Sequence, residues 1–426
     1  MAFIEAAPTP GITAAFFMTQ SELIPHLFRT EFRKITAVLC KAFSIEHMQM
    51  AEDIASETFL AALETWTYRG IPDNPVGWLY AVAKNKARSH FIRNQVFLQK
   101  VVPQLKTSSE SEAIEIDLSE QNIMDSQLRM TFAVCHPSIP AEAQVALALR
   151  ILCGFGIEEI ANAFLTNKET INKRLFRAKE KLREEKVSME LPAEKEIAHR
   201  LNAVLKTLYL LYNEGYYSES GDTILKEDLC LEAMRLTHLL TENERTDVPA
   251  VSALLSLMCF HSSRFKARTN ESGEMILYQD QDESLWDRAL ISKGAFYLRK
   301  ASVGTELSVY HLEAGIAWWH TVKCDTKEKW ESILQLYNRL LQLQYSPVAA
   351  LNRTFALAKA NGKGIAIAEA EKLKLTSNRF YFALLGELYT GIDHDKALQN
   401  FEKALEMAVT VAERRVIENK IAALRR

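Results

Sequence analysis

Apolar residues recur at helical spacing over most of the chain, and the clearest case lies near its middle. One stripe has the spacing i, i+4, i+7 and i+11, and it consists of Ile171, Leu175, Ala178 and Leu182. A shorter stripe precedes it, at Ile157, Ile160, Ala161 and Phe164. Thr166-Asn167-Lys168 separates the two with a residue type that caps helices. The pattern predicts two short helices joined by about four residues.

The same spacing predicts further helices over 21–43, 50–66, 74–94 and 141–153. Asn74 is placed to cap the third of these, and Pro75 suits a first helical turn. Periodicity also persists through 188–426, and the 426 residues include only 15 glycines and 11 prolines. We therefore predict an all-α fold, with roughly two to four domains for a chain of this length.

Composition narrows the class of protein. Hydrophobic residues make up 48% of the chain and charged residues 25%, as in water-soluble globular proteins. No run of about 18 apolar residues occurs, so we predict no membrane-spanning segment. The six cysteines lie far apart without a CxxC pair. This spacing argues against a zinc ribbon or a disulfide framework and favours a reducing cytoplasm.

Positive charge is concentrated in the second helix of the central pair. Residues 168–186 hold eight Lys/Arg and four Glu, whereas the whole chain has a net charge of −3. Two short helices of which the second is basic fit the major groove of DNA. An ordinary solvated surface helix is the alternative, since basic amphipathic helices are common. We assign Asn172 and Lys173 to base contacts, and Arg174, Arg177 and Lys181 to phosphate contacts.

The stretch EEIANAFLTNKETINKRLFRAKEKLR resembles the promoter-binding domain four of the extracytoplasmic-function sigma factors. The matching parts are Glu159-Ile160-Ala161, Thr170-Ile171, Arg174-Leu175 and Arg177-Ala178. Leu165 stands where many such motifs carry a turn glycine, so the sequence departs from the family at the turn. The resemblance implies that this domain recognises a minus-thirty-five promoter element.

A second stretch, at 50–66, combines an apolar and an acidic face. The inward face is predicted at Phe59, Ala62, Leu63 and Trp66, and the acidic face at Glu52, Asp53, Glu57 and Glu64. Asp53 and Glu57 lie four residues apart, where two like charges cost a few tenths of a kcal/mol unless a basic partner offsets them. DIASETFLAALETW resembles the helix with which sigma domain two grips the RNA polymerase clamp. The resemblance implies that Asp53, Glu57 and Phe59 meet basic residues of the polymerase. Without that context a solvated acidic face is the simpler interpretation.

A third stretch, at 74–94, is basic in its second half. Its Lys and Arg residues, which attract phosphate, are Lys84, Lys86, Arg88 and Arg93. We assign Trp78 to the core rather than to base stacking. WLYAVAKNKARSHFIR resembles the segment of sigma domain two that opens and reads the minus-ten element, and Asn85 matches the base-contacting Asn of that family. This helix and the loop after it could supply a positive groove and a pocket for a flipped base.

Domain boundaries follow from where the periodicity stops. Residues 101–123 hold five acids and one Lys, and they predict an acidic linker with an extended reach of roughly 75 Å. The remaining predicted parts are a tail at 1–17, domain two at 18–100, domain four at 124–187 and a C-terminal helical domain at 188–426. Either Met1 or Met18 fits as the start of the protein.

The C-terminal domain contains a motif close to a tetratricopeptide repeat, at Leu385, Gly386, Tyr389, Ala397, Phe401 and Ala404. With a degenerate neighbour at 346–373, it predicts stacked helix pairs. Polar segments at 208–222, 280–287 and 346–358 invite functional roles. The acids of the second, Asp280, Asp282, Glu283 and Asp287, lack the spacing of an EF-hand. We assign them to helix ends or to a ligand or partner surface, rather than to a metal or to catalysis. The three segments resemble the extension of one sigma-factor subgroup, which implies a fused domain that controls sigma activity.

The resemblance covers residues 20–426 and predicts an alternative sigma factor that binds core RNA polymerase and promoter DNA. We expect no cofactor, no metal and no covalent chemistry of its own, with an unidentified ligand or protein as a further partner of the C-terminal domain. One rival is a free-standing helix-turn-helix regulator, which would need neither Asp53 and Glu57 nor Asn85. Another is an enzyme built around the acids at 280–287.

Overall fold

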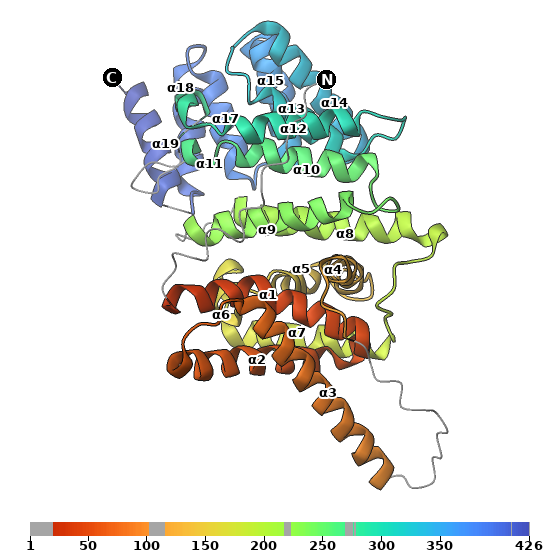
Figure 1. Cartoon of the computed structure of the whole chain (residues 1–426). Coiled ribbons are helices and arrows are strands. Elements are labelled where there is room, and N and C mark those ends of the chain that lie inside the picture. The colour runs from red at the N-terminus through yellow and green to blue at the C-terminus, as the bar shows by residue number, and fades with distance from the viewer. Residues whose placement is uncertain are drawn as a thin grey trace. The chain divides into compact units, whose positions relative to one another are not determined.

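The computed structural model describes residues 20–101, 116–216, 223–268, 276, 278–409 and 411–425. Every regular element in these ranges is a helix, which confirms the all-α prediction (Figure 1). No helix in the same ranges is long and apolar enough to cross a bilayer. The chain divides into two compact units, residues 1–240 and 241–426. The predicted tail at 1–17 and residues 102–115 of the predicted linker lie outside the described residues.

The first unit is built around its first helix. Its helices are α1 (Gln20–Phe43), α2 (Met48–Arg69), α3 (Pro75–Val101), α4 (Glu120–Val134), α5 (Ala141–Leu147), α6 (Ile157–Ala163), α7 (Lys168–Glu184), α8 (Glu194–Tyr216) and α9 (Thr223–Thr241). A 3-10 turn, η2 (Ile45–His47), and a π-helical turn, η3 (Ala148–Leu152), complete it. Helix α1 packs against α2, α3, α4 and η3, and its Phe32 and Ile35 are fully buried. The core therefore contains helices that precede the predicted linker and helices that follow it.

Local capping residues set several helix starts. The Asn74 side chain accepts a hydrogen bond from the Gly77 backbone N–H at 2.8 Å, and α3 begins at Pro75 as predicted. Asn167 caps α7 in the same way through Thr170, at 2.8 Å. Ser119 caps α4, which begins at Glu120. The predicted linker is therefore too long at its C-terminal end, where four of its residues form the first turn of a helix.

The two short helices of the central motif are α6 and α7, and the predicted stripe on α7 is buried throughout. Helix α7 packs it against α5 and α6. Leu165, in the turn between α6 and α7, has φ +48 and lies in the left-handed region that a glycine would occupy without strain. Leu165 thus adopts a left-handed backbone conformation at the position where the family pattern has a glycine.

The second unit consists of consecutive helices that pack pairwise. They are α10 (Pro249–Ser262), α11 (Phe265–Arg268), α12 (Arg288–Ala301), α13 (Val309–Trp319), α14 (Lys327–Leu343), α15 (Pro347–Asn361), α16 (Lys363–Leu373), α17 (Arg379–Tyr389), α18 (His394–Glu406) and α19 (Val411–Leu424), with 3-10 turns η4 (Tyr278–Asp280) and η5 (Glu283–Leu285). Neighbours from α13 to α19 pack on one another. Gly386 of α17 lies so close to the Phe401 ring of α18 that a Cβ would stand 2.8 Å from it. The motif glycine is thus needed for this helix crossing.

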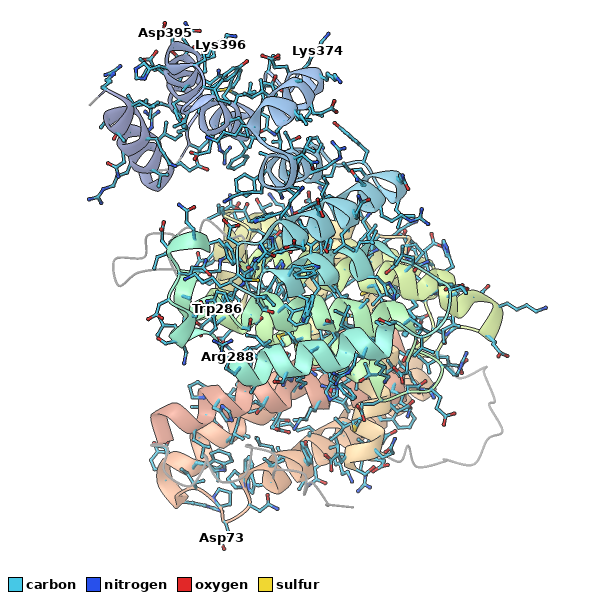
Figure 2. All side chains as sticks on the ribbon, turned by 90° about the horizontal axis from the view of Figure 1, so that it is seen from above. Asp73, Trp286, Arg288, Lys374, Asp395 and Lys396 are labelled. Carbon is cyan, nitrogen blue, oxygen red and sulfur yellow. The ribbon has the colours of Figure 1, made fainter. Side chains whose placement is uncertain are left out.

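Two of the four acids near residue 280 cap helical turns, which is one of the two roles that the sequence left open for them. Asp282 accepts a hydrogen bond from the Ser284 backbone N–H at 2.8 Å, and Asp287 caps α12 through Leu290 at 3.0 Å. At the start of α12, Figure 2 shows Trp286 beside Arg288, the first residue of this helix, whose guanidinium carbon lies 6.0 Å from the indole centroid. Residues 217–222 of the polar segment 208–222 lie outside the described residues.

Candidate nucleic-acid interface

Helix α7 presents one exposed face that combines an amide, two cations and an aromatic ring. Asn172, Lys173, Phe176 and Arg177 are all exposed on it. In the part of the chain that the structure describes, no carboxylate pairs with Lys173 or Arg177, so both cations face solvent. Phe176 is 65% exposed, which is unusual for an aromatic side chain among basic residues. Sequence reasoning missed Phe176, although its position four residues after Asn172 places it on the same face.

The other cations predicted on α7 are paired within the protein. Arg174 lies 2.9 Å from the Glu142 carboxylate, and its guanidinium carbon lies 5.2 Å from the centroid of the Phe164 ring. Lys181 lies 2.8 Å from Glu185. These two side chains can reach a phosphate only by leaving their carboxylates. Arg177 is therefore the more readily available phosphate contact.

Helix α3 places its predicted DNA residues unevenly. Asn85 and Arg88 are exposed and Lys84 is half-buried. Lys86 donates to Glu57 of α2 at 3.0 Å, which joins a predicted DNA contact to a predicted polymerase contact. Arg93 lies in the C-terminal part of α3, where the structure describes the backbone alone. Asn85 and Arg88 thus form the accessible part of this surface.

Helix α2 has an acidic face whose apolar neighbour differs from the predicted one. Asp53 and Glu57 are exposed. Phe59 is only 3% exposed, and its ring centroid lies 5.1 Å from that of Phe28, so in this conformation it belongs to the core. Leu60 is 55% exposed and follows Glu57 by three residues on the same face. Leu63, predicted to point inward, is also exposed.

Glu52, which the sequence placed on the acidic face, is instead buried. Its carboxylate accepts a hydrogen bond from Arg150 Nε at 3.2 Å and forms a short ion pair with Lys179 of α7. Two cations offset the cost of burying one carboxylate. Their sequence separations from Glu52 are 98 and 127 residues, so no local pattern reveals this contact.

Two further side chains, Arg29 and Arg33, tie α1 to later parts of the first unit. Arg29 pairs with Glu159 at 2.5 Å and with Asp228 of α9. Arg33 pairs with Glu232 of α9, which also binds Arg235 at 2.8 Å. Burial alone raises the pKa of Glu232, but the charges of Arg235 and Arg33 and their hydrogen bonds outweigh it and hold the pKa below its ordinary value. Glu232 therefore stays ionised.

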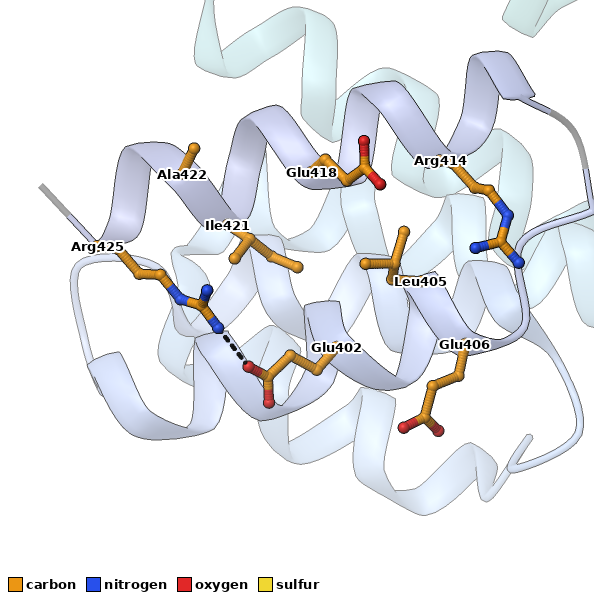
Figure 3. Close-up of a pocket in the computed structure, with 8 residues that line it drawn as sticks. All are labelled: Glu402, Leu405, Glu406, Arg414, Glu418, Ile421, Ala422 and Arg425. Atoms are coloured by element: carbon orange, nitrogen blue, oxygen red, sulfur yellow. Dashed lines mark hydrogen bonds and ion pairs between the residues drawn. The ribbon is translucent and has the colours of Figure 1, made fainter.

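The second unit has a hollow of about 800 Å³ between α18 and α19 (Figure 3). Its walls combine three glutamates and two arginines with three apolar residues, and Arg425 donates to Glu402 across it at 2.9 Å. Elsewhere in this unit His320 is partly buried, and desolvation together with the charges of Arg264 and Lys329 lowers its pKa to about 3. His320 is therefore neutral at physiological pH.

Comparison with protein families identifies three parts of the chain. Residues 28–96 match Sigma-70 region 2, and residues 129–182 match Sigma-70, region 4. Residues 200–302 match a family of unknown function (DUF6596). The first two matches coincide with the surfaces on α2 and α3 and on α7. The chain therefore carries the two domains of a sigma-70-type factor of transcription initiation.

Over 376 residues the chain is 32% identical to an uncharacterised protein of Rhizobium meliloti (strain 1021), a match that covers 86% of this chain and 88% of that protein. The chain belongs to the same family as this protein. It is also 26% identical over 145 residues to the RNA polymerase sigma-H factor of Pseudomonas aeruginosa, covering 32% of this chain and 72% of that factor. No solved structure matches the chain.

Proposed function

We propose that this chain is an alternative sigma factor of the extracytoplasmic-function type, which binds core RNA polymerase and directs it to promoters that its two DNA-binding regions recognise. The observation that carries the proposal is the solvent-facing surface of α7, where Asn172, Lys173, Phe176 and Arg177 lie together in a region 4 domain. An amide, two cations and an aromatic ring can recognise base edges, phosphates and thymine methyl groups.

Asn172 and Lys173 lie in the first turns of α7 and suit base edges, whereas Arg177 lies further along and suits phosphate. Phe176 extends the predicted set, because an exposed ring beside base-reading side chains can pack on a thymine methyl. In region 2, Asn85 and Arg88 are the accessible candidates for the minus-ten element, with Lys84 at the margin. Three further cations can contact phosphate once they release the carboxylates with which they pair; these are Arg174, Lys181 and Lys86.

The polymerase contact is proposed at Asp53, Glu57 and Leu60 of α2. The two carboxylates can meet basic side chains of the polymerase, and Leu60 supplies exposed apolar surface beside them. This assignment replaces Phe59 by its neighbour, since the Phe59 ring is enclosed by the core.

The C-terminal domain is proposed to control this activity through a partner of its own. Its consecutive helix pairs, with the close Gly386–Phe401 crossing, support a tetratricopeptide-like architecture. Stacked helix pairs commonly offer extended binding surfaces. The hollow between α18 and α19, with arginine and glutamate side chains, suits a partner segment that carries both charges.

A binding experiment with purified core RNA polymerase tests the proposed function. We expect the full chain to bind core and to give specific run-off transcripts on genomic fragments. Asp53→Arg should lose core binding because it reverses a charge on the proposed contact face, whereas Glu190→Arg makes the same charge change at an exposed site after α7 and should keep it. Specific DNA binding without any core binding would instead indicate a free-standing regulator.

A further inference from the structure

Helix α9 carries three charged side chains at the spacing of one helix face: Asp228, Glu232 and Arg235, at i, i+4 and i+7. Helix α1 carries Arg29 and Arg33, also four residues apart. Arg29 pairs with Asp228, and Arg33 pairs with Glu232. Equal spacing on both helices makes a two-rung ladder of ion pairs, in which α1 and α9 run in the same direction.

The same ladder also holds region 4. Arg29 donates to Glu159 of α6 at 2.5 Å, and its guanidinium carbon lies 4.8 Å from the centroid of the Phe155 ring. Arg235 donates to the Leu152 carbonyl oxygen at 2.8 Å. Arg29 lies in the region 2 segment and therefore joins it to both of the other segments that the family comparison separates. We call the set Arg29, Arg33, Asp228, Glu232 and Arg235 the α9 clamp.

The clamp is partly buried and closely packed, unlike a solvent-exposed surface ion pair. The side chains of Arg33 and Glu232 are 8% and 15% exposed, so each ion needs the other. Gly154, just after η3, has φ +75, and a Cβ there would stand 2.9 Å from the Arg29 carbonyl oxygen. Only a glycine allows the backbones of region 2 and region 4 to approach this closely.

A second contact closes the other side of the same arrangement. Glu52 of α2 is buried between Arg150 and Lys179, and Lys179 also donates to Gln49 at 3.1 Å. The C-terminal half of α7 is thereby held against region 2, while its DNA-facing N-terminal half stays exposed. Regions 2 and 4 thus form one compact body with α8 and α9.

The size of this body conflicts with simultaneous recognition of two promoter elements. A compact body of about 220 residues has a radius of gyration of roughly 17 Å, which for a sphere corresponds to a diameter of about 45 Å. Elements centred near positions −35 and −10 are about 25 base pairs apart, or roughly 85 Å along B-DNA. One closed body cannot span that distance, so the regions must separate if both elements are bound.

We propose that the α9 clamp is an internal lock that holds regions 2 and 4 in a closed resting arrangement, and that it opens when the two regions take up promoter elements on core polymerase. The functional half of this inference rests on the proposed sigma activity. The structural half, that α9 keeps the two regions together, does not.

The test measures the distance between regions 2 and 4 in the full chain by single-molecule energy transfer. Dyes are attached at Glu64→Cys on α2 and Asn162→Cys on α6, both exposed positions. Cys324→Ser removes the exposed cysteine among the described residues, where the other five cysteines are buried. The wild-type arrangement is expected to give one population, with the dyes closer together than about 45 Å.

Asp228→Arg places a cation against Arg29 and should shift molecules to a population beyond that distance. Adding Arg29→Glu restores an opposite-charge pair with position 228, and Glu159→Gln is combined with it so that no carboxylate faces the introduced glutamate. This triple variant should return the molecules to the closed population. Glu227→Arg makes a matched charge change at the neighbouring exposed residue and should leave the distance unaltered. An unaltered distance in folded Asp228→Arg, or failure of the triple variant to close, overturns the lock.

Should Asp228→Arg fail to fold, Asp228→Asn provides a milder test, because it removes the charge that faces Arg29 and keeps the size of the side chain. An increased open population is expected, and no increase contradicts the lock. Adding core polymerase together with a promoter duplex should open the wild type. A complex with core and promoter that forms without opening refutes the functional half, whereas core that does not bind counts against the sigma activity alone.

Discussion

Two neighbouring residues of α2, Phe59 and Leu60, have opposite environments, and they allow a test of the polymerase-binding face at single-residue resolution. Phe59 is 3% exposed and packs against Phe28, so Phe59→Ala should leave a cavity and lower the free energy of unfolding by about 3–5 kcal/mol. That is a large share of the stability of about 5–15 kcal/mol typical of a folded protein. Leu60 is 55% exposed, so Leu60→Ala should change stability by less than about 0.5 kcal/mol.

For polymerase binding we expect the opposite order, with a larger effect of Leu60→Ala than of Phe59→Ala. Full burial of a leucine side chain contributes about 1.5–3 kcal/mol, so covering the exposed half of Leu60 contributes about 1 kcal/mol. Leu60→Ala should therefore weaken binding to core about five-fold. Phe59→Ala should bind with unchanged affinity at temperatures where it remains folded.

The assay combines urea unfolding with titration of fluorescently labelled core polymerase. Leu231→Ala serves as the matched control, because Leu231 is a similarly exposed leucine on α9, at 57%, and should change neither quantity. A folded Phe59→Ala that binds core more weakly than Leu60→Ala would refute this assignment. The polymerase contact would then involve Phe59, and the core around it would have to rearrange on binding.

Three further outcomes are expected. In a promoter duplex chosen by run-off transcription, replacing the contacted thymine by uracil should weaken binding of the unsubstituted protein about four-fold, since one methyl contributes about 0.8 kcal/mol. The same replacement should not change the affinity of the Phe176→Ala variant. Equal losses of affinity in both proteins would place Phe176 away from the base. Leu165→Gly should raise the free energy of unfolding by about 0.5 kcal/mol, because relief of the left-handed backbone strain exceeds the entropy cost of glycine. A lower free energy of unfolding would instead show that the Leu165 side chain makes stabilising contacts. His320 has its pKa lowered to about 3 by burial, Arg264 and Lys329, so its neutral form contributes stability above pH 6.5 that is lost as the pH falls toward 3. Thermal unfolding of the full chain between pH 7 and pH 5 should show this loss of stability, at up to about 1.4 kcal/mol per pH unit for one proton. The His320→Gln variant should lose less stability over the same range. Identical pH profiles of the two proteins would contradict a neutral His320 in the folded state.

Local signals predicted the helices well because their physical causes are local. Asn74 and Asn167 accept hydrogen bonds from backbone groups three residues away, and α7 has a single apolar stripe bounded by charged residues. Helix α2 was harder to orient, because apolar residues surround much of it. Its exposed Leu60 and Leu63 differ from its buried Phe59 only through the partners that fold against them.

The candidate DNA surface was largely predictable, whereas the pairing of its charges was not. Asn172, Lys173 and Arg177 are exposed as a DNA-reading helix requires, and their contacts with DNA stay a prediction. The position of Glu52 depends on cations 98 and 127 residues away. Such long-range ion pairs leave no periodic trace in a single sequence, and neither does the choice between a free and a paired arginine.

The position of Arg29 limits how this protein can be recombined with its relatives. Its guanidinium pairs with Glu159 in region 4 and with Asp228 in the segment that follows. Region 2, region 4 and that segment are therefore complementary to one another. A chimera that joins this region 2 to region 4 of another sigma factor would leave Arg29 facing a foreign surface. Exchange of parts within this family should therefore succeed as complete sets that include α9, and fail at junctions that separate α1 from it.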